Sequence, residues 1–338
     1  MDLVETAFKA PPGAIVSPVV SRGQVVLRTA RWLPRLGPAK AGQGPGTVVI
    51  CAGRSEFVEK YYEAIGDLLE RGFTVVAFDW RGQGLSSRVL RNRLKGHVGD
   101  FARYRDDLAA VTAQLLEPFC PRPWYALAHS MGGTAALHFA AERPDVFERM
   151  VLSAPMIDLA GLRNPNLMRA VARIARHLGL GRGFIPVGRR RALFLSTFPG
   201  NVLTSDEPRF SRTAALLEVR PDLALGPPTI GWAWAAFKSM AKFKEEDFVQ
   251  RLTTPTLFIL AGADTVVDGR AAERLSARLR ASTIVTVRGA RHELLMERDV
   301  FRRQFWSAFD AFVPGMANPD LALDRTKEMQ KSHGSTVA

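Results

Sequence analysis

The stretch Pro123-Trp-Tyr-Ala-Leu-Ala-His-Ser-Met-Gly-Gly133 decides the fold, and an alanine-rich run follows it as far as Ala141. Its first six residues are a short apolar run of the length expected for a buried strand. Ser130 comes next between small residues, and helical spacing begins directly after it. This order predicts the nucleophile-elbow pattern G-x-S-x-G, with Ala128 in the first glycine position. Small residues flank such a serine because its strained turn brings the backbone close to its neighbours.

Further short apolar strands lie on both sides of this stretch. We expect strands at 47–52, 73–79, 149–154, 255–261 and 283–287, with helices at 57–71, 100–116, 131–141 and 299–313. Residues 14–33 predict an antiparallel pair of strands at the start. Strands that alternate with helices without an internal repeat predict an α/β fold with a doubly wound, mostly parallel sheet.

The alternation stops after the fourth major strand and resumes only near residue 255. We therefore predict a helical cap at 156–244, inserted between an N-terminal core part at 14–155 and a C-terminal core part at 245–314. Residues 315–338 are polar and aperiodic, which predicts a disordered tail.

The composition favours one body rather than two equal domains, since 47% of the 338 residues are apolar. The two cysteines, Cys51 and Cys120, form no CxxC or Cys/His cluster, so we expect reduced core residues and no metal site. No apolar run is long enough to span a membrane, and the first ten residues lack the features of a signal peptide. A cytoplasmic location is expected, with peripheral attachment to the inner face of the membrane as an open alternative.

A nucleophilic serine needs a base and an orienting acid, which follow it in the order Ser, Asp or Glu, His in this type of fold. Asp264 follows the strand at 255–261, and His292 follows the strand at 283–287. Both positions lie at the carboxyl edge of the sheet, where open α/β sheets build their sites. We predict Ser130 as nucleophile, His292 as general base and Asp264 as the acid.

Other interpretations of these residues remain open. A serine after a strand is often only a helix N-cap. Asp158 and Asp268 are rivals for the acid, although Asp268 is better placed to cap a helix that starts near residue 269. The other histidines lack the placement of His292: His97, His138 and His177 are predicted on loops or helix surfaces, His129 is the variable residue of the elbow, and His333 lies in the tail.

The tetrahedral intermediate of acyl transfer needs two backbone N–H donors. One comes from the residue after the nucleophile, which is Met131, and the other from the loop after the first buried strand. Arg54 is the expected second donor, through its amide rather than its side chain.

These segments resemble the lysophospholipase L2 and monoacylglycerol lipase group of α/β-hydrolases. The matching stretches are 52–62, 78–86, 128–133, 203–210, 261–267 and 289–293, so the resemblance covers most of residues 45–310. It implies the α/β-hydrolase fold, a Ser-His-Asp mechanism without a cofactor, and structural roles for Glu56 and Asp79. The sequence departs from the group at 52–53, where many relatives have His-Gly, and at Ala128.

The cap carries most of the excess charge of the chain, whose formal net charge is +13. Residues 155–244 hold 14 Lys and Arg against 5 Asp and Glu. A predicted helix places Arg169, Arg173 and Arg176 opposite Leu167, Val171, Ile174 and Leu178. A basic amphipathic helix of this kind suits an anionic membrane surface, although an ordinary surface helix packed on the sheet explains it too. Residues 188–191 add a cluster suited to phosphate.

Together these features favour an ester hydrolase that releases a fatty acid from a lysophospholipid, with Trp232, Trp234 and Phe237 as candidates for an apolar acyl pocket. A monoacylglycerol lipase or general carboxylesterase would share every catalytic residue. A peptidase is disfavoured by the basic cap. A non-catalytic lipid-binding protein of the same fold is the alternative from another class. Nucleic-acid binding is not expected, because no basic patch is interleaved with aromatic residues.

Overall fold

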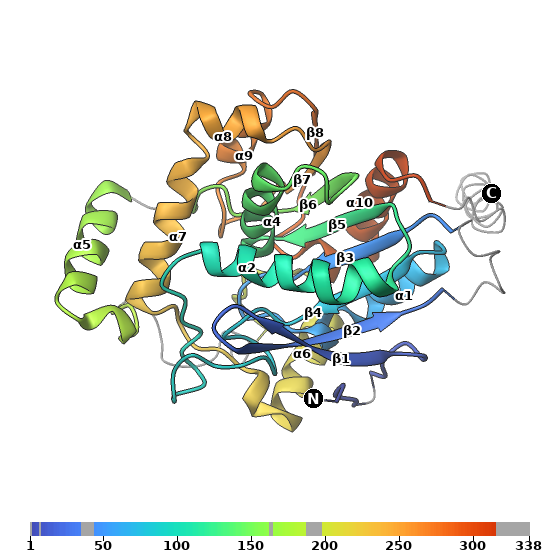
Figure 1. The fold of residues 1–338 in the computed structure, drawn as a ribbon, viewed down its shortest axis with the longest axis horizontal. Coiled ribbons are helices and arrows are strands. Elements are labelled where there is room, and N and C mark those ends of the chain that lie inside the picture. The colour runs from blue at the N-terminus through green and yellow to red at the C-terminus, as the bar shows by residue number, and fades with distance from the viewer. Residues whose placement is uncertain (1, 7, 35–43, 162–164, 187–197, 316–338) are drawn as a thin grey trace, which may run out of the picture.

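The computed structural model describes residues 2–6, 8–34, 44–161, 165–186 and 198–315. An eight-stranded sheet lies at its centre, with the strand order β1-β2-β4-β3-β5-β6-β7-β8 (Figure 1). The strands are β1 Ile15–Ser21, β2 Val25–Trp32, β3 Thr47–Cys51, β4 Thr74–Phe78, β5 Trp124–His129, β6 Arg149–Ser153, β7 Thr256–Ala261 and β8 Ser282–Val287. β1 pairs antiparallel with β2 and β2 with β4, whereas β3 to β8 are parallel. The mostly parallel sheet and the antiparallel first pair are confirmed.

The central strands are buried on both faces, which explains their continuous apolar runs. Every residue of β3, β4, β5 and β7 is buried, whereas the edge strand β8 is largely half-exposed. Helices α2 and α4 cross the near face in Figure 1, and α1 and α10 cover the opposite face. The helices outside the insertion are α1 Tyr62–Glu70, α2 Ala102–Val111, α3 Glu117–Phe119, α4 Met131–Glu142, α8 Glu246–Arg251, α9 Gly269–Ser276 and α10 Asp299–Phe312.

Three longer helices lie between β6 and β7, inside the range predicted for the cap: α5 Pro165–His177, α6 Glu207–Val219 and α7 Ile230–Lys242. α5 packs against α7 at one end of the molecule (Figure 1), and α6 lies apart from them and is joined by Arg209 to α1 and α10. β6 and β7 are neighbours in the sheet, so the insertion leaves and re-enters at adjacent strands. Of the predicted disordered tail at 315–338, only Gly315 lies within the described residues.

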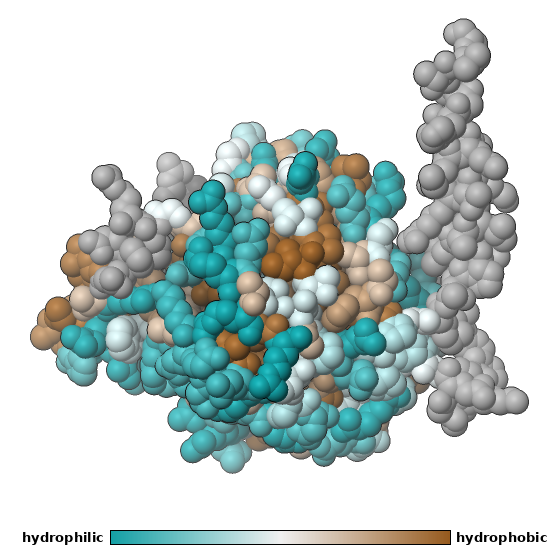
Figure 2. All heavy atoms as spheres, turned by 90° about the horizontal axis from the view of Figure 1, so that it is seen from above, coloured by the Kyte–Doolittle hydropathy of each residue, from teal (hydrophilic) through white to brown (hydrophobic). Residues whose placement is uncertain are grey.

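The orientation of α5 differs from the simpler expectation that this helix packs on the sheet. Leu167, Val171, Ile174 and Leu178 are all more than half exposed, and Ala172 is the buried residue of the helix. The apolar stripe therefore faces solvent, and hydrophobic residues reach the surface at the far end of the molecule (Figure 2). The expectation was wrong because periodicity marks an apolar side of a helix without saying which side meets the protein. The basic run at 188–191 lies outside the described residues.

None of the helices within the described ranges is long and apolar enough to cross a membrane.

Candidate active site

Ser130 lies at the sharp turn between β5 and α4, with a backbone φ of +49° and ψ of −116°. A positive φ at a non-glycine residue is strained and must be held by its surroundings. The Ser130 N–H donates to the Ser153 carbonyl at 3.1 Å, and its own carbonyl accepts from the Met156 N–H at 3.0 Å. Its side chain makes no capping hydrogen bond to α4. The N-cap interpretation therefore does not account for this serine.

Gly132 explains the small residues of the elbow. A Cβ at this position would lie 2.0 Å from the Cys51 carbonyl oxygen and 2.5 Å from that of Ala52. Ala128, by contrast, is fully buried within β5 and fits there with its methyl group. Because α4 approaches the end of β3 so closely, only glycine fits at position 132, two residues after the serine. Alanine fits at position 128, two residues before it.

His292 and Asp264 meet at the carboxyl edge of the sheet, beyond β8 and β7. The His292 ring donates through Nδ1 to Asp264 Oδ2 at 2.7 Å, and both side chains are almost fully buried. Asp264 Oδ1 accepts from the Val266 and Val267 N–H groups at 2.7 and 3.1 Å. Burial alone would raise the pKa of this carboxyl, but His292 and the two amides outweigh it and hold the pKa below its usual value. A carboxylate fixed in this way orients the histidine and stabilises its protonated form.

The two rival acids make other contacts. Asp268 caps α9 by accepting from the Arg270 N–H at 3.0 Å, as its position in the sequence indicates. Asp158 accepts from the N–H of Leu159 at 3.0 Å. Neither contacts His292 in the hydrogen bonds of the described residues.

His129, the residue before the predicted nucleophile, contacts the loop that carries His292. Its ring centroid lies 4.8 Å from that of His292, and Ser130 is the next residue along the chain. Ser130 and His292 are 8% and 4% exposed, so the reaction centre is shielded from bulk water. Burial lowers the pKa of His129 to about 4, which leaves its ring neutral at physiological pH.

The two predicted oxyanion donors belong to neighbouring strands. Arg54 follows β3, Met131 opens α4 after β5, and β3 pairs with β5 as far as Cys51 and Ala128. The Arg54 side chain is engaged with the cap: it donates to the Gly226 carbonyl at 2.7 Å and lies 5.2 Å from the ring centroid of Trp232. Burial lowers the pKa of this guanidinium to about 10.

A buried ionic cluster beneath the site was not predicted in full. Lys60 donates to Glu56 at 2.7 Å and to Glu293 at 2.6 Å. Glu56 also accepts from the N–H of Gly53, so the cluster joins the oxyanion loop to the residue after His292. Burial raises the pKa of Glu56, but Lys60 and the adjacent His129 outweigh it and bring the pKa to about 2.

The resemblance indicated Glu56, whereas sequence reasoning missed Lys60 and Glu293. The i, i+4 spacing of Glu56 and Lys60 and the carboxylate next to His292 were the available signals. Glu56, His129 and Glu293 also lie within 4.8 Å of one another, as metal ligands do. The Lys60 ammonium already bonds to both carboxylates and supplies the positive charge at this position.

Asp79 has the structural role that the resemblance implied. Its carboxylate accepts from the N–H groups of Val58 and Leu85 at 3.0 and 2.8 Å. Arg28 pairs with it at 2.7 Å and also with Glu59, and all three charged side chains are fully buried. Asp79 therefore ties two loops of the site edge to the sheet.

The three aromatic candidates for the acyl pocket do not gather at one place. Trp232 is buried and donates to the Tyr104 hydroxyl at 3.1 Å. Trp234 and Phe237 instead line a groove of about 470 Å³ between α5 and α7. A separate cavity of about 750 Å³ reaches the predicted triad only at Asp264.

One predicted surface histidine is buried. His138 on α4 is 7% exposed and stacks on Phe243 with 4.9 Å between ring centroids. The helix that follows the elbow is covered by α8 and the end of α7, so its full circumference is buried.

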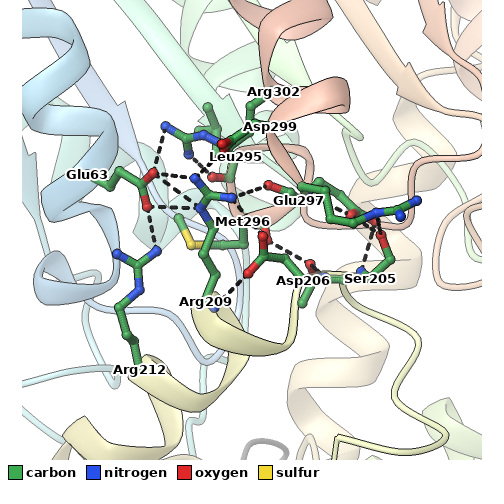
Figure 3. A network of polar contacts seen from close by, with 12 residues as sticks. Glu63, Ser205, Asp206, Arg209, Arg212, Leu295, Met296, Glu297, Asp299 and Arg302 are labelled. Carbon is green, nitrogen blue, oxygen red and sulfur yellow. Dashed lines mark hydrogen bonds and ion pairs between the residues drawn. The ribbon is translucent and has the colours of Figure 1, made fainter.

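A polar network attaches α6 to the core beside the histidine loop (Figure 3). Arg209 binds Glu63 of α1 and Asp299 of α10, each at 2.6 Å. Glu297 accepts from the Arg291 N–H at 2.9 Å and from the Ser205 N–H at 3.1 Å, and thus holds the residue before His292. The stretch at 203–210, noted for its resemblance, forms this attachment.

Comparison with known proteins identifies the family of the chain. The family described as "Serine aminopeptidase, S33" matches residues 42–299. The chain belongs to this family of α/β-hydrolases. Lysophospholipase L2 of Escherichia coli is 36% identical over 75% of this chain and 76% of that protein. Probable lysophospholipase L2 of Haemophilus influenzae is 27% identical over 79% and 83% of the two chains.

Among solved structures, a soluble variant of monoglyceride lipase from Saccharomyces cerevisiae has the same fold, with a TM-score of 0.68 and 19% identity over 90% of this chain and 96% of that one. The protein is therefore an ester hydrolase of the lysophospholipase and monoacylglycerol lipase group, as the sequence motifs predicted. The alternative of a non-catalytic binding protein is set aside.

Proposed function

We propose that the hydrolase releases a fatty acid from lysophospholipids through an acyl-enzyme on Ser130. The hydrogen bond between His292 and Asp264, close to the strained Ser130, is the observation that carries this proposal. The Ser130 hydroxyl attacks the acyl carbonyl and gives its proton to His292 Nε2, because Nδ1 is already bound to Asp264. The oxyanion accepts hydrogen bonds from the Met131 and Arg54 amides.

His292 then donates the proton to the leaving alcohol, and the acyl group remains on Ser130. A water molecule, deprotonated by His292, attacks this ester and releases the fatty acid and free serine. The mechanism requires neither a metal nor an organic cofactor.

Two observations favour a lysophospholipid as substrate. Two relatives that match about three quarters of the chain, one of them 36% identical, are named for this substrate. The cap region is strongly basic, which suits a phosphate-bearing ester. The same charge suits peripheral contact with an anionic membrane surface, and for a cytoplasmic protein this surface is the inner face of the membrane. Of the three aromatic candidates, Trp232 remains the one for contact with the acyl chain, because it lies against the Arg54 side chain, whereas Trp234 and Phe237 line the separate groove between α5 and α7.

Hydrolysis of monoacylglycerol is the second candidate, favoured by the likeness to a solved monoglyceride lipase. The two candidates differ only in the headgroup, since the acyl-transfer chemistry is the same.

The test compares fatty-acid release from a lysophosphatidylglycerol and from a monoacylglycerol with the same acyl chain, at low and high salt. We expect kcat/KM to be about tenfold higher for the lysophospholipid at low salt, and the preference to shrink at high salt as charges are screened. Ser130→Ala should abolish both activities. Equal or faster turnover of the neutral ester would overturn the substrate, and activity that survives in Ser130→Ala would overturn the mechanism.

A further inference from the structure

The groove between α5 and α7 gathers cations that have few acidic partners. Arg169 and Arg173 from α5 and Lys238 and Lys242 from α7 line it, together with one carboxylate, Glu245. Lys238 pairs with Asp100 at 2.9 Å outside the groove. Within the described part of the chain, Arg169, Arg173 and Lys242 form no ion pair. These three cations repel one another, and a bound anion would relieve that repulsion.

One of these cations carries an unsatisfied donor. The Nε of Arg169 is buried and has no hydrogen-bond partner among the described residues. The Nε atoms of Arg31, Arg54 and Arg88 are also without a partner in the residues that the structure describes. Arg169 is the one of the four that lines this groove, where a bound anion could supply the acceptor. A guanidinium offers paired N–H donors that match the oxygens of a phosphate group.

The floor of the groove is apolar and aromatic. Trp234, Phe237 and Ala241 of α7 line it, and the Arg169 guanidinium lies 5.8 Å from the ring centroid of Phe237. Its volume is about 470 Å³, which is enough for a headgroup-sized ligand. The ligand that fits is therefore an anion joined to apolar or neutral organic parts, rather than a bare inorganic ion.

The opposite side of α5 points to a membrane as the source of that anion. Val171, Ile174 and Leu178 are 56%, 56% and 71% exposed, and at about 100° per residue they lie opposite Arg169 and Arg173. Interfacial helices bury their apolar side by about 5–10 Å, and a helix is about 10 Å across. With the stripe in the interface, the groove would lie at the depth of the lipid phosphates.

We propose that this groove binds the phosphate of an anionic phospholipid headgroup, at a site separate from Ser130. Arg169, Arg173 and Lys242 bind the phosphate oxygens, and Trp234 and Phe237 contact the glycerol portion. The site gives the membrane contact proposed above a defined chemical partner, and it does not depend on which ester is hydrolysed.

The experiment measures flotation of the full chain carrying Ser130→Ala with vesicles of phosphatidylcholine alone or mixed with phosphatidylglycerol. The catalytic substitution separates this test from the proposed function, because no lipid is hydrolysed. We expect binding to the phosphatidylglycerol vesicles, and Arg173→Gln/Lys242→Gln should weaken it about tenfold or more. Arg280→Gln/Arg303→Gln removes the same charge from exposed positions on the core and should stay within about twofold.

A second variant tests the groove at constant charge. Ala241→Phe should fill the floor and weaken binding as much as the loss of two cations does. Equal loss in the groove and core variants, or full binding by Ala241→Phe, would overturn the proposal. Binding of glycerol 3-phosphate in solution without any binding to phosphatidylglycerol vesicles would overturn its assignment to a lipid.

Discussion

Asp264 and Asp268 are four residues apart, and their environments give them different roles. Asp264 accepts two backbone amides on one oxygen and His292 on the other. Asp268 accepts a backbone amide at the start of α9 and pairs with Arg274 on the surface. A carboxylate thus binds the proposed catalytic histidine at one position and caps a helix at the other.

Replacement of each by asparagine should separate the roles. Asp264→Asn removes the negative charge that orients and stabilises His292, so kcat should fall by about three to four orders of magnitude. Asp268→Asn keeps a good N-cap residue, and activity should stay within about twofold of the wild type. Steady-state hydrolysis of p-nitrophenyl butyrate measures both. If Asp268→Asn lost more activity than Asp264→Asn, Asp264 would not be the catalytic acid.

At the scale of elements, the buried cluster couples loops that are distant in sequence. Lys60 precedes α1, and Glu293 follows β8, 233 residues later. Glu56 connects the same lysine to the amide of Gly53 in the oxyanion loop. The relative position of the oxyanion loop and the histidine loop therefore depends on one ammonium group.

Lys60→Met should leave two buried carboxylates facing each other without a cation. Removal of one partner from a buried ion pair destabilises by about 3–5 kcal/mol, so the free energy of unfolding in urea should fall by that amount. The esterase activity of the folded variant should also be lower than that of the wild type, because Lys60 no longer joins the oxyanion loop to the histidine loop. Lys60→Met/Glu293→Leu should recover part of the stability. Lys244→Met, at an exposed lysine, is the control and should change little.

Local sequence patterns predicted the helices and strands well, but they did not predict the contacts between residues that are distant in the sequence. The strands, the elbow at Ser130 and the loops of Asp264 and His292 follow from apolar runs and from residues at strand ends. The strand order and the pairing of Lys60 with Glu293 depend on tertiary packing across the whole chain. The outward side of α5 could not be predicted, because an amphipathic period is the same whichever side faces the protein.

Across the whole molecule, one source of acid sensitivity should be the network where α6 meets the core. Burial raises the pKa of Glu63, but Arg209, Arg302 and Arg212 outweigh it and lower the pKa from 4.5 to about 2. Because the folded pKa is the lower one, this carboxylate stabilises the fold at neutral pH. Its contribution is lost as the pH falls from 4.5 toward 2.

Glu63→Gln should therefore lower the free energy of unfolding by about 2 kcal/mol at neutral pH, allowing for partial solvent screening. The difference from the wild type should shrink toward zero as the pH approaches the folded pKa. Urea unfolding at a series of pH values measures it. Glu70→Gln, at an exposed position on the same helix, should track the wild type at every pH. A constant difference across the pH series would contradict the assignment.

The insertion that carries α5, α6 and α7 starts and ends at β6 and β7, which are hydrogen-bonded neighbours. Its two ends are already held together by the sheet, so its length adds little to the entropic cost of folding the core. Such a segment can be lengthened, shortened or exchanged during evolution while the strands that precede the proposed catalytic residues keep their register. Substrate range and membrane preference can then diverge among relatives with the hydrolytic chemistry inherited unchanged.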